Sequence, residues 1–348
     1  MRRWLSSAPA ALLLALWLIA GCSSDAERSV AAPAPAPRLP DGEAGDLLRR
    51  AIDAAGGWER WTAVRDVSFI STQTIVDPGR EVTSDSIGWF MAPLHDGARA
   101  RMDSIGLPTE VRFGIDAAET WIVSNGRAVT APGQLALTRF DMVSNLFWFS
   151  LPFLLAEQPV ELSAPGEVRG PEGERWQRLR ADFETPNPAV PGPWVVLYID
   201  AATGLIDHVH SHLSAPFLRH ELWIGQWLDY RDCGGFRKER QRQFFPADAE
   251  GAIVGAMVAE QFVEHVRFNN GYAAAHFARP QVASEKPEAA RKGEGSTEGH
   301  PAGEIRFDRR DLARGVSETV GVPHAGLRGR SPDGHGPHYR TQPAAVLF

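Results

Sequence analysis

The stretch Phe140-Asp-Met-Val-Ser-Asn-Leu-Phe-Trp-Phe-Ser-Leu-Pro-Phe-Leu-Leu155 is the most apolar run in the chain beyond its N-terminal segment. Its apolar residues recur at helical spacing and widen from one face to most of the circumference, which is typical of a helix buried on several sides. The run is shorter than the ~20 apolar residues that a membrane span needs. We therefore predict a buried helix over residues 138–155, beginning at Thr138, which forms a capping-box pattern with Asp141.

Short β-branched runs between turn residues predict a long antiparallel sheet around this helix. The expected strands are 67–76, 82–91, 98–105, 109–115 and 119–123 before the helix, and 160–163, 175–183, 194–199, 205–213, 220–230, 236–245 and 263–268 after it. Asn125-Gly126 predicts a hairpin, and residues 200–204 a turn. A second helix is expected from Asp41 to Ala55, ended by Gly56-Gly57. The fold class is α+β, with about eleven or twelve strands.

Composition and charge exclude one class of partner. Hydrophobic residues make up 43% of the 348 residues and charged residues 23%, which is ordinary for a globular protein. The formal net charge is −7, and removal of residues 1–21 with their two arginines would take it to −9. An acidic chain has no electrostatic basis for binding nucleic acid, so no nucleic-acid partner is expected.

The N-terminal segment predicts export and lipidation. Residues 1–21 have the basic start and short apolar core of a signal peptide. Ile19-Ala20-Gly21-Cys22 resembles the bacterial lipobox, which implies that Cys22 carries diacylglycerol and an N-acyl chain such as palmitate. The alternative is an ordinary secretory signal with an incidental cysteine. Several acyl chains give stable membrane anchoring, and Ser23, by resemblance to enterobacterial lipoproteins, favours the outer membrane facing the periplasm.

Two segments differ in composition from the middle of the chain. Residues 22–40 are rich in alternating Ala and Pro, which predicts an extended tether. Residues 280–348 are rich in Gly and Pro, nearly lack aromatic residues and show no periodicity, which predicts disorder. The folded domain is therefore expected over residues 41–279.

Three motifs of this domain resemble one family. Ala51-Ile-Asp-Ala-Ala-Gly-Gly-Trp-Glu-Arg-Trp61, Leu146-Phe-Trp-Phe-Ser-Leu-Pro-Phe153 and Trp194-Val-Val-Leu-Tyr-Ile-Asp200 are similar to segments of bacterial outer-membrane lipoprotein-sorting proteins related to the Lol-type carriers. The resemblance implies a curved antiparallel sheet, an incomplete half-barrel, with helices plugging its open side. It also implies an apolar cavity that takes acyl chains. The polar strand at residues 237–243 and the segment after 280 depart from the family pattern.

A curved sheet closed by an apolar helix can leave room for a ligand, or its side chains can fill the space. The aromatic residues expected to line such a cavity are Trp89, Trp121, Phe140, Phe147, Trp148, Phe149 and Phe153. Composition alone favours a filled core, whereas the resemblance supports a cavity, and both interpretations stay open here.

The remaining candidate residues have weaker patterns. His208, His210 and His212 alternate along one expected strand and could present three imidazoles to a zinc ion. The other face of that strand is apolar, so the histidines are expected on the solvated face. Cys233 has no neighbouring Cys or His and is expected to be an inert thiol. No nucleophile elbow, zinc-protease motif or phosphate loop is present in the sequence, so neither catalysis nor a cofactor is predicted.

Three functions follow from these patterns. The first is a lipid-anchored envelope protein that binds an acyl chain, a lipid or a lipoprotein in a half-barrel cavity. The second is a structural or interaction lipoprotein whose interior is filled. The third is a metal-dependent hydrolase that uses the histidine face.

Overall fold

The computed structural model describes residues 37, 39–76, 82–95, 98–107, 109–184, 187–215 and 218–282. Its helices are α1 (Glu43–Ala55), α2 (Trp58–Thr62) and α3 (Pro132–Ser150), with 3₁₀ helices η1 (Phe153–Ala156) and η2 (Ala274–His276). Its strands are β1 (Asp66–Val76), β2 (Val82–Pro93), β3 (Arg99–Ser104), β4 (Val111–Asp116), β5 (Glu119–Ser124), β6 (Arg127–Val129), β7 (Val160–Arg169), β8 (Arg175–Phe183), β9 (Trp194–Asp200), β10 (Ile206–His212), β11 (Leu222–Cys233), β12 (Phe236–Pro246) and β13 (Ala259–Phe268).

The strands form one antiparallel sheet of thirteen, in the order β6-β5-β4-β3-β2-β1-β13-β12-β11-β10-β9-β8-β7. The sheet consists of two meanders, β1–β6 and β7–β13, which meet where β1 pairs with β13. Strands β6 and β7 end the sheet without pairing to each other, so among the described strands the sheet is open. The predicted antiparallel sheet is confirmed, and the predicted count of about eleven or twelve strands is slightly too low.

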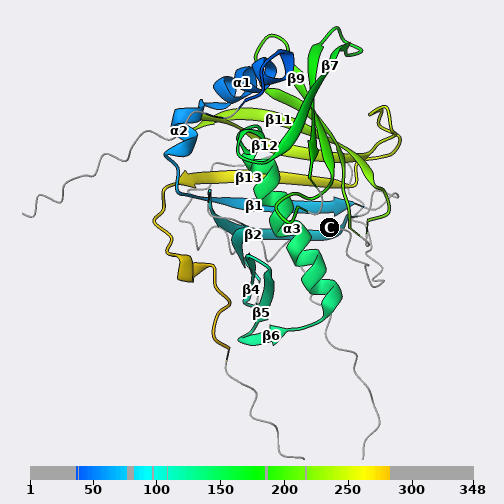
Figure 1. The fold of residues 1–348 in the computed structure, drawn as a ribbon. Coiled ribbons are helices and arrows are strands. Elements are labelled where there is room, and N and C mark those ends of the chain that lie inside the picture. The colour runs from blue at the N-terminus through cyan, green and yellow to red at the C-terminus, as the bar shows by residue number, and fades with distance from the viewer. Residues whose placement is uncertain are drawn as a thin grey trace, which may run out of the picture. The chain divides into compact units, whose positions relative to one another are not determined.

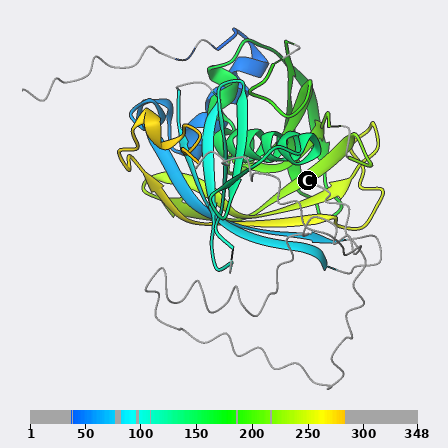
Figure 2. The ribbon, with the colours of Figure 1, turned by 90° about the horizontal axis from the view of Figure 1, so that it is seen from below.

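Helix α3 connects the two edges of this sheet, because it follows β6 and precedes β7. Its 19 residues span about 28 Å at 1.5 Å per residue. A flat sheet of thirteen strands would be about 58 Å wide at ~4.8 Å per strand. Figure 1 shows α3 running across the strands, and Figure 2 shows the sheet curving around it. The curvature brings the edges within reach of the connection and gives the helix neighbours on several sides.

The start of α3 differs from the prediction. The helix begins at Pro132, six residues before Thr138, and it has no side-chain hydrogen bond at its N-cap. Proline suits the first turn because its fixed φ is helical and the N–H it lacks would have no intrahelical partner. Thr138 therefore lies inside the helix, and the capping-box interpretation is wrong.

Helix α1 packs its apolar face near β7, β8 and β12 and ends at Ala55, followed by Gly56, as predicted. It begins at Glu43 with Gly42 as its N-cap, so the predicted cap at Asp41 is wrong. Gly56 has φ +131°, and a Cβ atom there would lie 2.8 Å from Gly235 O. Glycine is therefore required by both the backbone conformation and the close approach of the β11–β12 turn. None of the helices in the described part of the chain has both the length and the apolar character needed to cross a membrane.

The strand register assigns each side chain to one of two faces. We call the face that carries α3 the inner face, and its opposite the outer face. Phe90 of β2 stacks on Phe69 of β1, and Phe69 stacks on Phe149 of α3, so these strand residues point inward. Because side chains alternate along a strand, Met91 and its cross-strand neighbour Arg101 point outward.

A C-terminal strap, residues 269–278, packs on the outer face. The carboxylate of Asp66 accepts hydrogen bonds from the backbone N–H groups of Asn270, Gly271 and Tyr272, at 2.7, 2.9 and 3.3 Å. Further along the strap, Arg101 donates a hydrogen bond to His276 O at 3.2 Å. The strap thus covers part of the face that α3 does not.

Candidate ligand-binding site

Three consecutive aromatic residues of α3 contact different parts of the inner face. Phe147 meets Phe183 of β8 with ring centroids 5.8 Å apart. Trp148 meets Trp227 of β11 at 5.7 Å, and Phe149 stacks on Phe69 of β1 at 5.0 Å. Successive helical residues point about 100° apart, so these contacts require strands on at least three sides of the helix. The inner face and α3 together form the apolar core of the domain.

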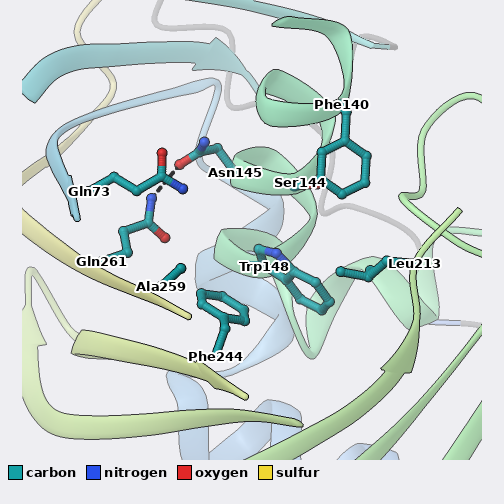
Figure 3. Close-up of a pocket in the computed structure, with 9 residues that line it drawn as sticks. All are labelled: Gln73, Phe140, Ser144, Asn145, Trp148, Leu213, Phe244, Ala259 and Gln261. Carbon is teal, nitrogen blue, oxygen red and sulfur yellow. Dashed lines mark hydrogen bonds between the residues drawn. The ribbon is translucent and has the colours of Figure 1, made fainter. Parts of the chain in front are cut away.

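A small cavity lies between α3 and strands β1, β12 and β13 (Figure 3). It is lined by Gln73, Phe140, Ser144, Asn145, Trp148, Leu213, Phe244, Ala259 and Gln261. Its volume is about 20 Å³, which is room for a single water molecule and far too little for an acyl chain. In this conformation side chains fill the space beneath α3.

A buried row of hydrogen bonds crosses from α3 to the sheet at this cavity. Asn145 donates to the backbone O of Asp141 at 2.9 Å and to its carboxyl group at 3.0 Å, and Gln261 Nε2 donates to Asn145 Oδ1 at 2.7 Å. Arg242 donates to Gln261 Oε1 at 3.0 Å and is ion-paired with Glu239. Arg242 and Glu239 are both buried, so each charge depends on the other. This row, from Asp141 to Glu239, is called the polar row below.

Asp141 is the acidic end of the polar row. Burial disfavours its charged form and raises the pKa of its carboxyl group to about 7, against the opposing effect of the hydrogen bond from Asn145. The group is therefore partly protonated near neutral pH.

Lys238 of β12 ties the C-terminal end of α3 to the sheet. Its buried ammonium group donates hydrogen bonds to Phe149 O and, at 3.2 Å, to Leu151 O, and it lies 4.6 Å from the centroid of the Phe149 ring. These carbonyl groups lack intrahelical partners because they belong to the end of the helix. Burial lowers the pKa of Lys238 to about 8.

Five of the seven aromatic residues predicted for a cavity lie at α3 and η1. Phe140 and Trp148 line the small cavity, and Phe147, Phe149 and Phe153 are packed in the surrounding core. Phe153 stacks on Trp61 of α2 at 4.5 Å, which extends the core to the start of the domain.

The other two predicted residues, Trp89 and Trp121, lie on the outer face, so their assignment to the cavity is wrong. Trp89 precedes the inward-pointing Phe90 and packs under the guanidinium group of Arg267, 5.7 Å from its ring centroid. Trp121 is buried beneath the C-terminal strap and donates a hydrogen bond to Phe277 O at 3.1 Å. On β2 the consecutive aromatic residues Trp89 and Phe90 left the inward position undecided in the sequence, and on β5 Trp121 and its apolar neighbour Ile122 did the same.

The three histidines lie on the outer face of β10 but do not share a site. His208 contacts the side chain of Gln226, with 3.2 Å between nitrogens, and His212 lies 3.4 Å from a carboxylate oxygen of Glu221. His210 is not on solvated surface as expected. It is buried, and burial lowers the pKa of its imidazole. Within the described residues, no group of three His, Cys, Asp or Glu side chains is arranged to hold a metal ion.

Only one of the two cysteines lies within the described residues. Cys22 lies outside the described residues, so its lipidation stays a prediction, as do the signal peptide, most of the tether and nearly all of the expected disordered tail. Cys233 is a half-buried free thiol whose pKa is raised by burial, so it is not activated as a nucleophile.

The sequence analysis did not identify the polar residues of the cavity. Ser144, Asn145 and Gln261 are buried, and Gln73 is partly buried. One pattern could have identified Gln261, because it falls between Ala259 and Val263 on the inward-pointing positions of β13. A polar residue in an apolar row of a strand indicates a buried hydrogen-bonding group.

Comparison with known proteins gives similarity of fold only. No protein-family model matches the chain, and no curated protein sequence matches it. A solved LolA superfamily protein from Nitrosomonas europaea matches 69% of this chain and 99% of its own, with 9% identity and a TM-score of 0.44. A Vibrio parahaemolyticus domain, named for outer membrane lipoprotein sorting, matches 67% and 94%, with 12% identity and a TM-score of 0.39.

A DUF1329 family protein from Desulfovibrio piger matches 68% of this chain and 98% of its own, with 11% identity and a TM-score of 0.42. At these scores the similarity carries no information about a ligand.

Proposed function

We propose that this chain is a lipid-anchored protein of the bacterial cell envelope that binds an acyl chain of a lipid or lipoprotein between α3 and the inner face of its sheet. The supporting observation is the packing of α3. From Phe140 onward the helix is largely buried, and it meets the sheet through aromatic rings. An acyl chain buries the same kind of apolar surface, so it can take the place of part of this packing.

Ligand entry requires α3 to move, because side chains fill the space beneath it. The hydrogen bonds that hold the described part of the helix to the sheet include those of Asn145 with Gln261, of Lys238 with the helix end, and of Arg139 with Ala117 O. Full burial of a palmitoyl chain, with about 14 methylene groups at ~0.8 kcal/mol each, would contribute about 11 kcal/mol before the costs of association. That is enough to offset part of the packing lost by the helix.

The test is native mass spectrometry of the protein made in a bacterial periplasm with Cys22 replaced, followed by solvent extraction. We expect extra mass that extracts as lipid. Trp148→Asp should abolish lipid uptake, because it places a charge among the contacts that the acyl chain would take over. Trp89→Asp is the matched control, since Trp89 lies on the outer face, and it should retain uptake. Circular dichroism establishes that both variants are folded.

One observation favours a second function. The filled interior suits a structural or interaction lipoprotein whose outer surface binds another envelope protein. A protein without extractable lipid that also fails to take up added lipid would support this second function and contradict the first.

A further inference from the structure

The lining of the small cavity is divided into a polar and an apolar side. Figure 3 shows the amide side chains of Gln73, Asn145 and Gln261 on one side, and the rings of Phe140, Trp148 and Phe244 with Leu213 on the other. An amphiphile with a polar end and a hydrocarbon chain would match this division.

None of the nine lining residues carries an ionisable side chain. Arg242 is the nearest buried cation along the polar row, but it contacts the cavity lining only through Gln261. Its guanidinium group donates hydrogen bonds to Glu239 and Gln261. A carboxylate or phosphate placed in the cavity would therefore be desolvated without a cation beside it, which is strongly unfavourable.

One hydrogen-bonding group at the cavity is unsatisfied. The hydroxyl of Ser144 is buried and has no hydrogen-bond partner among the described residues. Asn145 and Gln261, in contrast, use their amide groups in the polar row. A hydroxyl can donate one hydrogen bond and accept others, so Ser144 suits an ester or amide carbonyl, or an alcohol.

We infer that the acyl ligand has an uncharged polar end, an ester, amide or hydroxyl group, which hydrogen-bonds to Ser144 while its chain lies against Trp148 and Phe244. This inference rests on the proposed function and narrows its ligand class to neutral acyl esters and amides, such as monoacylglycerols, rather than free fatty acids. Gln73, Asn145 and Gln261 provide three amides at the same cavity.

The experiment compares monopalmitoylglycerol with palmitate at pH 8, by competition against a fluorescent acyl probe on delipidated protein. We expect monopalmitoylglycerol to bind at least about tenfold more tightly than palmitate. Ser144→Ala should weaken binding of monopalmitoylglycerol about three- to tenfold, the effect of one lost hydrogen bond, and leave that of palmitate unchanged. Ser150→Ala, also buried on α3 but absent from the cavity lining, is the matched control and should change neither affinity.

Each other outcome is decisive. Palmitate binding as tightly as the glyceride would overturn the inference while leaving acyl binding intact. Equal losses for both ligands in Ser144→Ala would show that the hydroxyl does not recognise the polar end, and would also overturn it. Failure of the wild-type protein to bind the probe and both lipids would instead overturn the proposed function itself.

Discussion

At the scale of single residues, the carboxyl group of Asp141 should make the stability of the domain depend on pH. Its pKa of about 7 in the folded chain compares with an ordinary value of 3.8. Between these values the folded protein binds a proton that the unfolded chain does not. Stability should therefore fall as pH rises from about 4 to 7 and stay level above that.

Asp141→Asn should remove this dependence while keeping the shape of the side chain and an oxygen that accepts from Asn145. We expect the difference in free energy of unfolding between variant and wild type to grow by about 1–3 kcal/mol over that pH range, because the variant has no charged form. Urea denaturation at several pH values measures this difference, and contributions of other groups cancel. A difference that does not change with pH would show that Asp141 titrates normally.

Residue-level prediction succeeded where the spacing determined the direction of a side chain and failed where it did not. Residues 147–149 are three consecutive aromatics on a helix that has strands on at least three sides, so all of them meet the core. Trp89 and Phe90 are consecutive on a strand, where one must point outward. The sequence offers two large aromatics for one inward position, and only the cross-strand register decides between them.

At the scale of elements, the C-terminal end of α3 depends on one side chain. Lys238→Met should destabilise the domain by about 2–4 kcal/mol, because Phe149 O and Leu151 O would be left buried without donors. The matched control is Arg175→Met on β8, where the ion pair with Glu167 is exposed and contributes little to stability. Chemical denaturation of both variants provides the test. Equal and small losses of stability in the two variants would mean that water replaces the ammonium group as the hydrogen-bond donor.

The elements themselves were largely predictable. Twelve of the strands were expected near their observed positions, because apolar runs and turn residues alternate clearly along the chain. Strand β6 has only three residues and no apolar periodicity, so the Asn125-Gly126 hairpin was predicted without its second strand. The start of α3 was missed because none of residues 132–139 is buried and they carry no continuous apolar face.

At the scale of the whole domain, β13 joins the two meanders. It pairs with β1 on one side and β12 on the other. A chain ending at residue 258 should therefore lose cooperative thermal unfolding, whereas a chain ending at residue 282 should keep its midpoint within about 3 °C, because the hydrophobic core lies within residues 39–268. Circular dichroism melts of both chains, with Cys22 replaced, measure the effect. A cooperative transition at an unchanged midpoint in the shorter chain would contradict it.

The filling of the interior could not be predicted at any scale from the sequence. The same aromatic residues are compatible with a filled core or a hollow one, since the outcome depends on how strongly the sheet curves and how deeply α3 lies in it. The side chains of Trp148 and Phe244 approach to 6.2 Å between ring centroids, and with the other core side chains they leave only the small cavity.

An open sheet has two unpaired borders, and each could recruit a strand from another molecule and begin an aggregate. The border at β6 offers only three residues. The border at β7 contains Pro165, which has no N–H to offer, and its pairing with β8 is irregular between Ser163 and Gly166. Glu161, Glu167 and Arg169 add exposed charges along it. These features should keep neighbouring copies apart wherever the protein is crowded, which is the situation of any protein confined to a membrane surface.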